Sequence, residues 1–120
     1  MTITFEAMRK IGDSWHGVHN MDLNLANGNA AAVFLLVIPP NQVWGPSGAI
    51  EDRETLEILR VNLFQAINAE GYRKAALRPI EKDSNFTGYG IDDKYIVEKL
   101  ERLRDIVHSC IQWGYMFAWR

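Results

Sequence analysis

Asparagines are concentrated in one stretch of this 120-residue chain, at Asn20, Asn24, Asn27 and Asn29, directly before the most apolar run, residues 31–37. The chain is expected to pass there from a strand into a helix, where free backbone N–H groups and the helix dipole favour an anion. Side-chain amides supply further hydrogen-bond donors and acceptors. We therefore take Asn24, Asn27 and Asn29 as candidate ligand-binding residues.

The same asparagines also have a purely structural interpretation. Asn27 is the best N-cap candidate of the expected helix, because its side-chain oxygen can accept from an unpaired N–H group of the first turn. Asn24 would then face solvent from the strand, and Asn29 would lie exposed in the first helical turn. A contact between subunits is a third use of the cluster, and the sequence leaves all three open.

Four arginines in the second half of the chain are a second candidate group: Arg60, Arg73, Arg78 and Arg104. The planar guanidinium group matches phosphate and carboxylate in geometry and charge. Arginines that face a common groove would therefore bind an anion. We include Arg60, Arg78 and Arg104 in the candidate ligand site, with scattered, solvated surface arginines as the alternative.

Two histidines, His16 and His19, lie three residues apart with Asp13 and Asp22 nearby. Zinc needs three or four ligands that converge in space. Two histidines at this spacing equally fit a surface hairpin. We therefore assign no metal ligand and no metal ion to this chain.

No complete catalytic set is found in the sequence. Cys110 would need a neighbouring base to act as a nucleophile, but it lies on the expected buried face of the last helix, where it serves as a small hydrophobe. His108 adjoins the same face and is expected to be packed or partly exposed. Ser47 lacks the Gly-x-Ser-x-Gly context, and residues 88–90 (Gly-Tyr-Gly) lack the further glycine of a phosphate loop. We expect no catalytic residue and no cofactor.

Composition places the chain among ordinary globular proteins, with 48% hydrophobic and 23% charged residues and a net charge of -2. This charge argues against general nucleic-acid binding. The single cysteine excludes a disulfide within the chain and fits a reducing, cytoplasmic setting. The longest apolar run, residues 30–40, is far shorter than the roughly 20 residues that span a bilayer, so no membrane contact is expected.

Hydrophobic spacing predicts the elements that must position these residues. Residues 1–20 form an N-terminal extension, read as an edge strand or a hairpin with a turn at 12–14, and residues 21–25 alternate as a strand. A helix begins near residue 27 and ends at Pro39-Pro40, and a loop follows over 41–48.

The second half is predicted to contain two helices and further strands. The first helix begins at Glu51 or Asp52 and ends near Asn68. Its apolar positions have one helical period: Leu56, Leu59, Leu63, Phe64 and Ile67. Two short strands are expected over 72–80 and 86–89.

The last helix is predicted from an N-cap at Asp92 to a left-handed stop at Gly114. Its buried stripe is Ile96, Leu100, Leu103, Val107 and Cys110 or Ile111. A terminal strand over 115–119 places three aromatic side chains on one face, which we interpret as a surface for self-association. The order of elements predicts one α+β domain over residues 1–120, with about three helices packed on one face of a mostly antiparallel sheet.

Several short motifs resemble a family of small, largely uncharacterised proteins of bacteriophages and prophages. The motifs are Leu-Asn-Leu-Ala-Asn-Gly-Asn-Ala at 23–30, Gly-Ala-Ile at 48–50, Tyr-Gly at 89–90, the leucine pair Leu100 and Leu103, and the terminal Gly114 and Trp119. The resemblance covers roughly residues 21–119. The chain departs from it by some 20 extra residues at the front and by Pro39-Pro40, where the family has a Leu-Gly helix end. The resemblance implies a mobile-element context and transfers no catalytic role.

These observations favour a non-catalytic phage or prophage binding protein that counters a host defence process, by sequestering a small nucleotide-like signal or by blocking a host protein. A structural or assembly protein of a phage particle or replication complex is the first alternative, and a small hydrolase that uses His16 or His19 is the second. The expected partners are a second copy of the chain and a small anionic ligand or host protein, and the expected location is the cytoplasm of the host cell.

Overall fold

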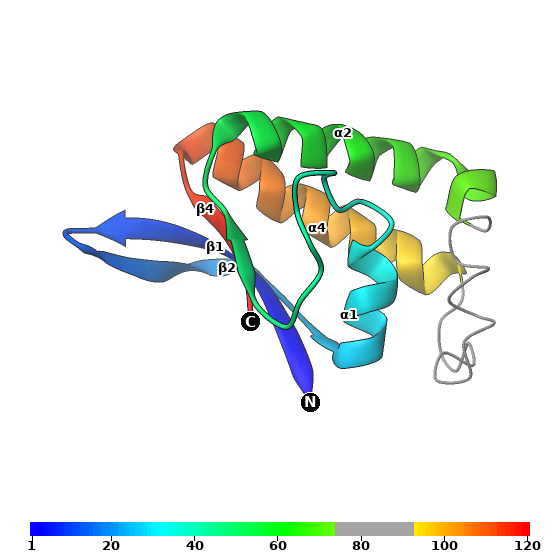
Figure 1. Ribbon diagram of the computed structural model, residues 1–120, viewed down its shortest axis with the longest axis horizontal. Coiled ribbons are helices and arrows are strands. Elements are labelled where there is room, and N and C mark those ends of the chain that lie inside the picture. The colour runs from blue at the N-terminus through cyan, green and yellow to red at the C-terminus, as the bar shows by residue number, and fades with distance from the viewer. Residues whose placement is uncertain (74–92) are drawn as a thin grey trace.

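The computed structural model describes residues 1–73 and 93–120, which form strands on one side and helices on the other (Figure 1). The elements are β1 Thr2–Ile11, β2 Ser14–Ala26, α1 Asn27–Phe34, β3 Gly48–Ile50, α2 Arg53–Asn68, α4 Asp93–Trp113 and β4 Met116–Trp119. The strands pair antiparallel in the order β2-β1-β4-β3. The predicted α+β class is confirmed.

Part of the prediction lies outside the described residues: most of the expected strand 72–80, the expected strand 86–89, the glycine triplet 88–90, Arg78 and the Asp92 cap. Residues 70–73 are helical, so the strand does not begin at 72. No helix among the described residues is long and apolar enough to cross a membrane.

Strands β1 and β2 form the predicted hairpin, which turns at Gly12 with a φ of 62°. Strand β1 is not an edge strand, because β4 returns from the far end of the chain and pairs with its other side, from Phe5↔Trp119 to Met8↔Met116. Beyond Met8 only β1 and β2 remain paired, and this two-stranded arm projects from the body (Figure 1). The edge positions belong to β2 and β3.

Strand β2 carries a bulge at residues 18–21. The pairing moves from Glu6↔Asp22 to Met8↔Gly17, so four residues of β2 lie opposite a single residue of β1. Asn20 has a φ of 62°, a left-handed conformation that asparagine tolerates better than most residues. Arg102 of α4 donates to the carbonyl oxygens of Asn20 and Asp22, and these hydrogen bonds hold the bulge against the helix.

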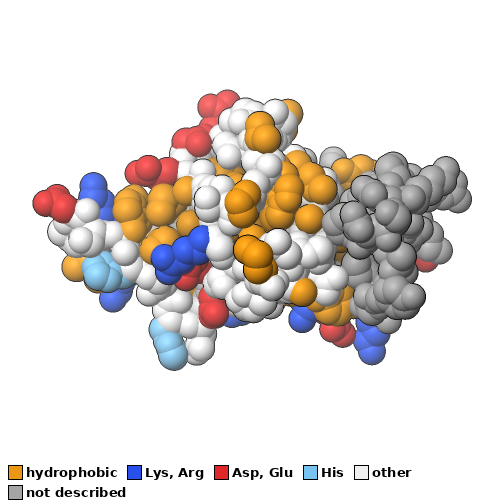
Figure 2. Space-filling model, turned by 60° about the horizontal axis from the view of Figure 1, so that its bottom comes forward, with side chains coloured by type: hydrophobic (Ala, Val, Ile, Leu, Met, Phe, Trp, Pro, Cys, Tyr) orange, Lys and Arg blue, Asp and Glu red, His pale blue; other side chains and the backbone are white. Residues whose placement is uncertain are grey.

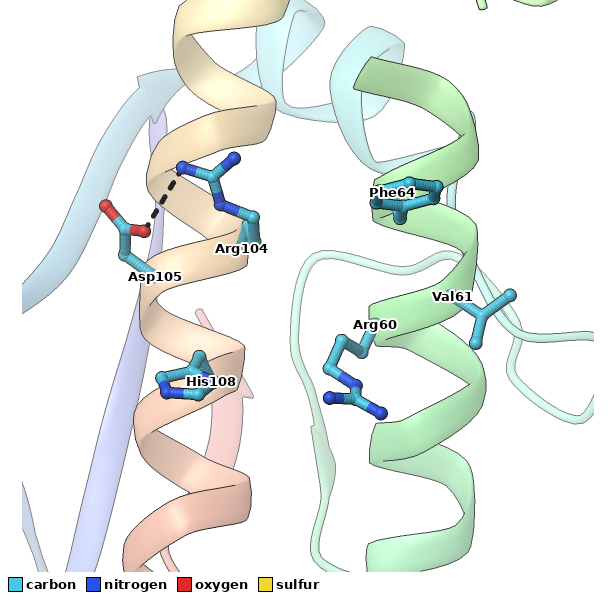
Figure 3. Close-up of a pocket in the computed structure, with 6 residues that line it drawn as sticks. All are labelled: Arg60, Val61, Phe64, Arg104, Asp105 and His108. Carbon is cyan, nitrogen blue, oxygen red and sulfur yellow. Dashed lines mark hydrogen bonds and ion pairs between the residues drawn. The ribbon is translucent and has the colours of Figure 1, made fainter. Parts of the chain in front are cut away.

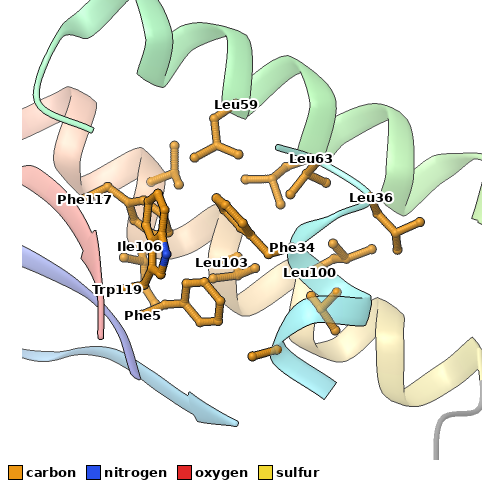
Figure 4. Packing of buried hydrophobic residues seen from close by; sticks show 14 of the residues in the cluster. Phe5, Phe34, Leu36, Leu59, Leu63, Leu100, Leu103, Ile106, Phe117 and Trp119 are labelled. Atoms are coloured by element: carbon orange, nitrogen blue, oxygen red, sulfur yellow. The ribbon is translucent and has the colours of Figure 1, made fainter. Parts of the chain in front are cut away.

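The core fills the space between the sheet and the helices (Figure 4). Phe34 of α1 lies at its centre, with its ring centroid 4.9 Å from that of Trp119 and 5.4 Å from that of Phe5. Phe117 and Trp119 are 0% and 2% exposed. The predicted surface of strand aromatics is therefore wrong, because β4 lies between two other strands and its aromatic face is covered by helices.

Helix α2 begins as predicted, with the Asp52 carboxylate accepting from the backbone N–H of Thr55. Leu59 and Leu63 are buried, but Phe64 is 65% exposed. The predicted stripe is therefore wrong at Phe64, because one residue turns the helix by about 100° and carries the ring past the covered face.

Helix α4 buries its whole predicted stripe and ends at Gly114, whose φ is 71°. The N–H of Tyr115 donates to the carbonyl of Cys110 over 2.9 Å, which is the hydrogen bond of a Schellman motif. This stop turns the chain into β4 and so places the terminal aromatics in the core.

Strand β3 lies between the predicted loop 41–48 and the predicted helix start at Glu51 or Asp52, where we predicted no strand. Gly48 pairs with Trp119, and a Cβ atom at this position would lie only 2.2 Å from the indole ring. The indole N–H of Trp119 donates to the carbonyl of Gly45 over 3.1 Å. This edge strand forms because a small residue lets its backbone approach the large ring.

Arg73 joins the end of α2 to the start of α4. Its Nε and Nη2 atoms lie 2.8 and 2.9 Å from the two carboxylate oxygens of Asp93. Its Nη1 atom donates to the carbonyls of Ala66 and Ile67, which are free acceptors in the last turn of α2. Arg73 is 5% exposed, so this arginine has a structural role in the fold.

Candidate functional site

A pocket of about 490 Å³ lies between α2 and α4. This volume falls within the roughly 300–1,000 Å³ that is usual for small-molecule sites. Three side chains come from each helix: Arg60, Val61 and Phe64 from α2, and Arg104, Asp105 and His108 from α4. Figure 3 shows Arg60 and Phe64 on the side of α2 that faces α4. We call this pocket the α2–α4 groove.

The same spacing positions the lining residues on both helices. Residues four apart share one face of a helix, as Arg60 and Phe64 do on α2 and Arg104 and His108 do on α4, and Val61 and Asp105 each follow the first residue of these pairs. The inner faces of the helices pack through buried leucines such as Leu59 and Leu103. The two lining sets therefore meet on the outer side of the helix pair, where a ligand has access.

Within the described residues, exposed ion pairs hold the two arginines of the groove. Arg60 lies 2.6 Å from Glu57, with side chains 49% and 34% exposed. Arg104 lies 3.5 Å from Asp105, with side chains 44% and 55% exposed. Such pairs contribute only about 0–1 kcal/mol to stability, so both guanidinium groups can turn to an incoming anion at little cost.

Two hydrophobic side chains of the groove are open to solvent. Phe64 is 65% exposed and Val61 is 50% exposed. Aromatic rings beside guanidinium groups suit a ligand that combines a negative charge with a planar ring, because base–aromatic stacking adds about 1–3 kcal/mol per base. The groove therefore offers both charge and stacking to one ligand.

The candidate asparagines do not form one cluster. Asn24 donates to the Thr4 hydroxyl over 2.7 Å on the exposed side of the hairpin. Asn29 donates to the phenol oxygen of Tyr95 over 3.2 Å and so ties α1 to α4. It is half-buried rather than exposed. The structure thus gives these two residues hydrogen-bond partners on different elements, Asn24 on β1 and Asn29 on α4.

The predicted N-cap at Asn27 is wrong. Ala26 occupies the cap position with φ -56° and ψ 147°, without a side-chain hydrogen bond, and Asn27 is the first helical residue. The hairpin explains the difference: β2 stays paired up to Ala26, and the N–H of Asn27 donates to the carbonyl of Met1 over 3.2 Å. Asn27 instead lines a second pocket of about 420 Å³ with Trp44 and Pro46.

Of the predicted arginines, Arg60 and Arg104 meet in the α2–α4 groove, Arg73 is buried against Asp93, and Arg78 lies outside the described residues. On the face shown in Figure 2, acidic and basic side chains are scattered among hydrophobic ones, and the described residues there form no patch of one sign.

His108 and Asp105 line the groove, whereas the other groups considered for chemistry lie elsewhere or are inaccessible. His16 and His19 are exposed on β2. Among the described residues, no three His, Cys, Asp or Glu side chains converge as a metal site. Cys110 is 1% exposed, and burial raises the pKa of its thiol to about 12. The Cys110 thiolate, which would be the nucleophile, is therefore disfavoured in the folded protein.

Sequence reasoning missed four residues of the groove: Val61, Phe64, Asp105 and His108. Phe64 was expected in the core but is exposed, and His108, which was expected to be packed or partly exposed, is exposed. The available signal was the excess of apolar residues on α2, which supply a second stripe beyond the buried one. No protein-family model, no curated protein and no solved structure matches this chain.

Proposed function

We propose that the protein is a non-catalytic binding protein that sequesters a small, phosphate-bearing, nucleotide-like ligand in the α2–α4 groove. One observation carries this proposal: Arg60 and Arg104, which are 44 positions apart in the sequence, line the same pocket together with the exposed ring of Phe64. Guanidinium groups recognise phosphate, and the ring offers a stacking surface for a base.

The resemblance to phage and prophage proteins supplies the biological setting of the proposal. A phage protein that holds a nucleotide signal of its host would counter a defence process by lowering the concentration of free signal. Binding alone is sufficient for this role. The exposed groove and its weakly engaged arginines fit a site that captures a ligand from solution.

Calorimetry against a panel of linear and cyclic nucleotides and ADP-ribose tests the proposal. The double variant Arg60→Ala/Arg104→Ala should weaken the binding of a panel member at least about a hundredfold, because each charged hydrogen bond contributes about 1.5–3 kcal/mol. Arg53→Ala is the matched control, since Arg53 lies on the same helix, is 77% exposed and does not line the groove.

Phe64→Ala separates stacking from charge. This variant should weaken the binding of nucleotides roughly five- to a hundredfold, as expected for the loss of about 1–3 kcal/mol of stacking energy. The binding of pyrophosphate, which has no base, should be unchanged. A wild-type protein that binds no member of the panel would overturn the proposal, as would equal losses of affinity in the double variant and in Arg53→Ala.

A further inference from the structure

Helix α2 has a second apolar stripe on its outer side. Ile58, Val61 and Phe64 follow one another at intervals of three residues and are 37%, 50% and 65% exposed. The buried stripe of the same helix consists of other residues, among them Leu59 and Leu63. Nothing in the described part of the chain covers the outer stripe, and exposed apolar surface of this kind is typical of an interface.

Ile58 and Phe64 lie three residues before and three residues after Val61, so the stripe is evenly spaced about its middle residue. Two copies can meet face to face about a two-fold axis that passes near Val61 and is perpendicular to the stripe. The two stripes then run in opposite directions. Ile58 of each copy then lies against Phe64 of the other, and the two Val61 side chains meet at the axis. A two-fold interface uses the same patch twice, so it requires a patch that is complementary to itself. A large ring opposite a medium-sized aliphatic side chain meets this requirement.

The charges around the stripe differ between its two ends. Glu54 and Glu57 line a pocket with Ile58 and Val61, whereas Arg60 and Arg104, with Asp105, line the groove with Val61 and Phe64. When the stripes run in opposite directions, the acidic end of each copy lies against the arginine-bearing end of the other, which is the charge complementarity of an interface. Because Glu57 lies 2.6 Å from Arg60, a two-fold contact brings ion pairs together rather than bare cations.

We propose that a second copy of this chain covers the outer stripe of α2 in a two-fold dimer centred on Val61. Self-association was expected from the sequence on the aromatic strand, but Phe117 and Trp119 are buried, and α2 supplies a different surface. Val61 and Phe64 also line the α2–α4 groove, so a second copy and a base stacked on Phe64 would compete for this ring. This last point rests on the proposed ligand site, whereas the dimer itself does not.

Disulfide trapping without any ligand tests the arrangement. Val61→Cys should cross-link under mild oxidation to a species of about twice 13.7 kDa, because the two introduced thiols meet at the axis. Ile58→Cys is the matched control. Its two thiols would lie six residues apart along the stripe, at least about 9 Å, and should not cross-link. A mixture of Ile58→Cys and Phe64→Cys chains should cross-link, and the buried Cys110 gives little background.

Light scattering provides the second measurement. The wild-type protein should show twice the chain mass, and Phe64→Glu should raise the dimer dissociation constant at least about tenfold, with an unchanged circular dichroism spectrum because the residue is exposed. A wild-type monomer at all concentrations, or cross-linking of Ile58→Cys alone as complete as that of Val61→Cys, would overturn the proposal. Nucleotide binding is measured separately, so its failure does not alter these results.

Discussion

Arg73 allows a sharp test of how the fold is held together. The variant Arg73→Lys keeps the charge but removes the planar fork that donates to Asp93 through two nitrogens and to the carbonyls of Ala66 and Ile67 through a third. A lysine ammonium cannot match these separated acceptors at once. Removing one partner of a buried ion pair costs about 3–5 kcal/mol. Asp93 is 41% exposed and regains water, so the lower end applies to Arg73→Ala.

We therefore expect the free energy of unfolding to fall by about 3 kcal/mol in Arg73→Ala and by about 2 kcal/mol in Arg73→Lys. Urea titration followed by circular dichroism measures both values, with the slope of the transition expected to be unchanged. Arg53→Ala is the control, because its ion pair with Glu57 is exposed and 3.8 Å long; its effect should stay below about 0.5 kcal/mol. If Arg73→Lys is as stable as the wild type, the fork geometry does not matter and the reasoning is refuted.

Three further predictions concern single atoms or groups of the fold. Gly48→Ala should destabilise the protein by at least about 1–3 kcal/mol, because its Cβ would lie 2.2 Å from the buried ring of Trp119, and thermal unfolding would detect the change. Cys110 should react with a thiol reagent at pH 8 only as fast as the protein unfolds. Burial raises the pKa of the Cys110 thiol from its ordinary value of 9.0 to about 12, so its contribution to stability should be complete below pH 9 and lost as the pH rises towards 12, in contrast to Cys110→Ala. Hydrogen bonds from Thr55 lower the pKa of Asp52 from 3.8, so the stabilising effect of this cap should be present above pH 3.8 and lost as the pH falls through the folded pKa. The variant Asp52→Asn should remove this pH dependence, which urea titrations at pH 3 and pH 6 would measure.

The proposed site and the proposed dimer use the same outer surface of α2. Phe64 is the residue on which both depend, since it lines the groove and forms one end of the stripe. An exposed phenylalanine in the middle of a stable helix costs solubility without adding to the core. A second copy that covers the ring, or a base that stacks on it, would remove this cost. The dimer experiment and the nucleotide panel address these two uses separately.

The sequence by itself determined the elements whose signals are local. The 3.6-residue period of α4, the stop at Gly114 and the start of α2 at Asp52 depend on neighbours within a few positions, and each is found where predicted. The α+β class follows from the order of these elements. Arg60 and Arg104 could be named as candidates because a guanidinium group has the same chemistry wherever it lies.

Only the tertiary structure decided which surfaces meet. Strand β1 became central because β4, more than a hundred residues later, pairs with it, and the same pairing buried Trp119 instead of exposing it. The α2–α4 groove exists because two helices separated in the sequence pack side by side, which no local pattern encodes. The helical period of α2 predicts that one face is covered, but not how wide the covered face is. In the folded protein this face is too narrow to include Phe64, which therefore faces solvent. The asparagines had a clear local motif, but the paired end of β2 moved the cap to Ala26.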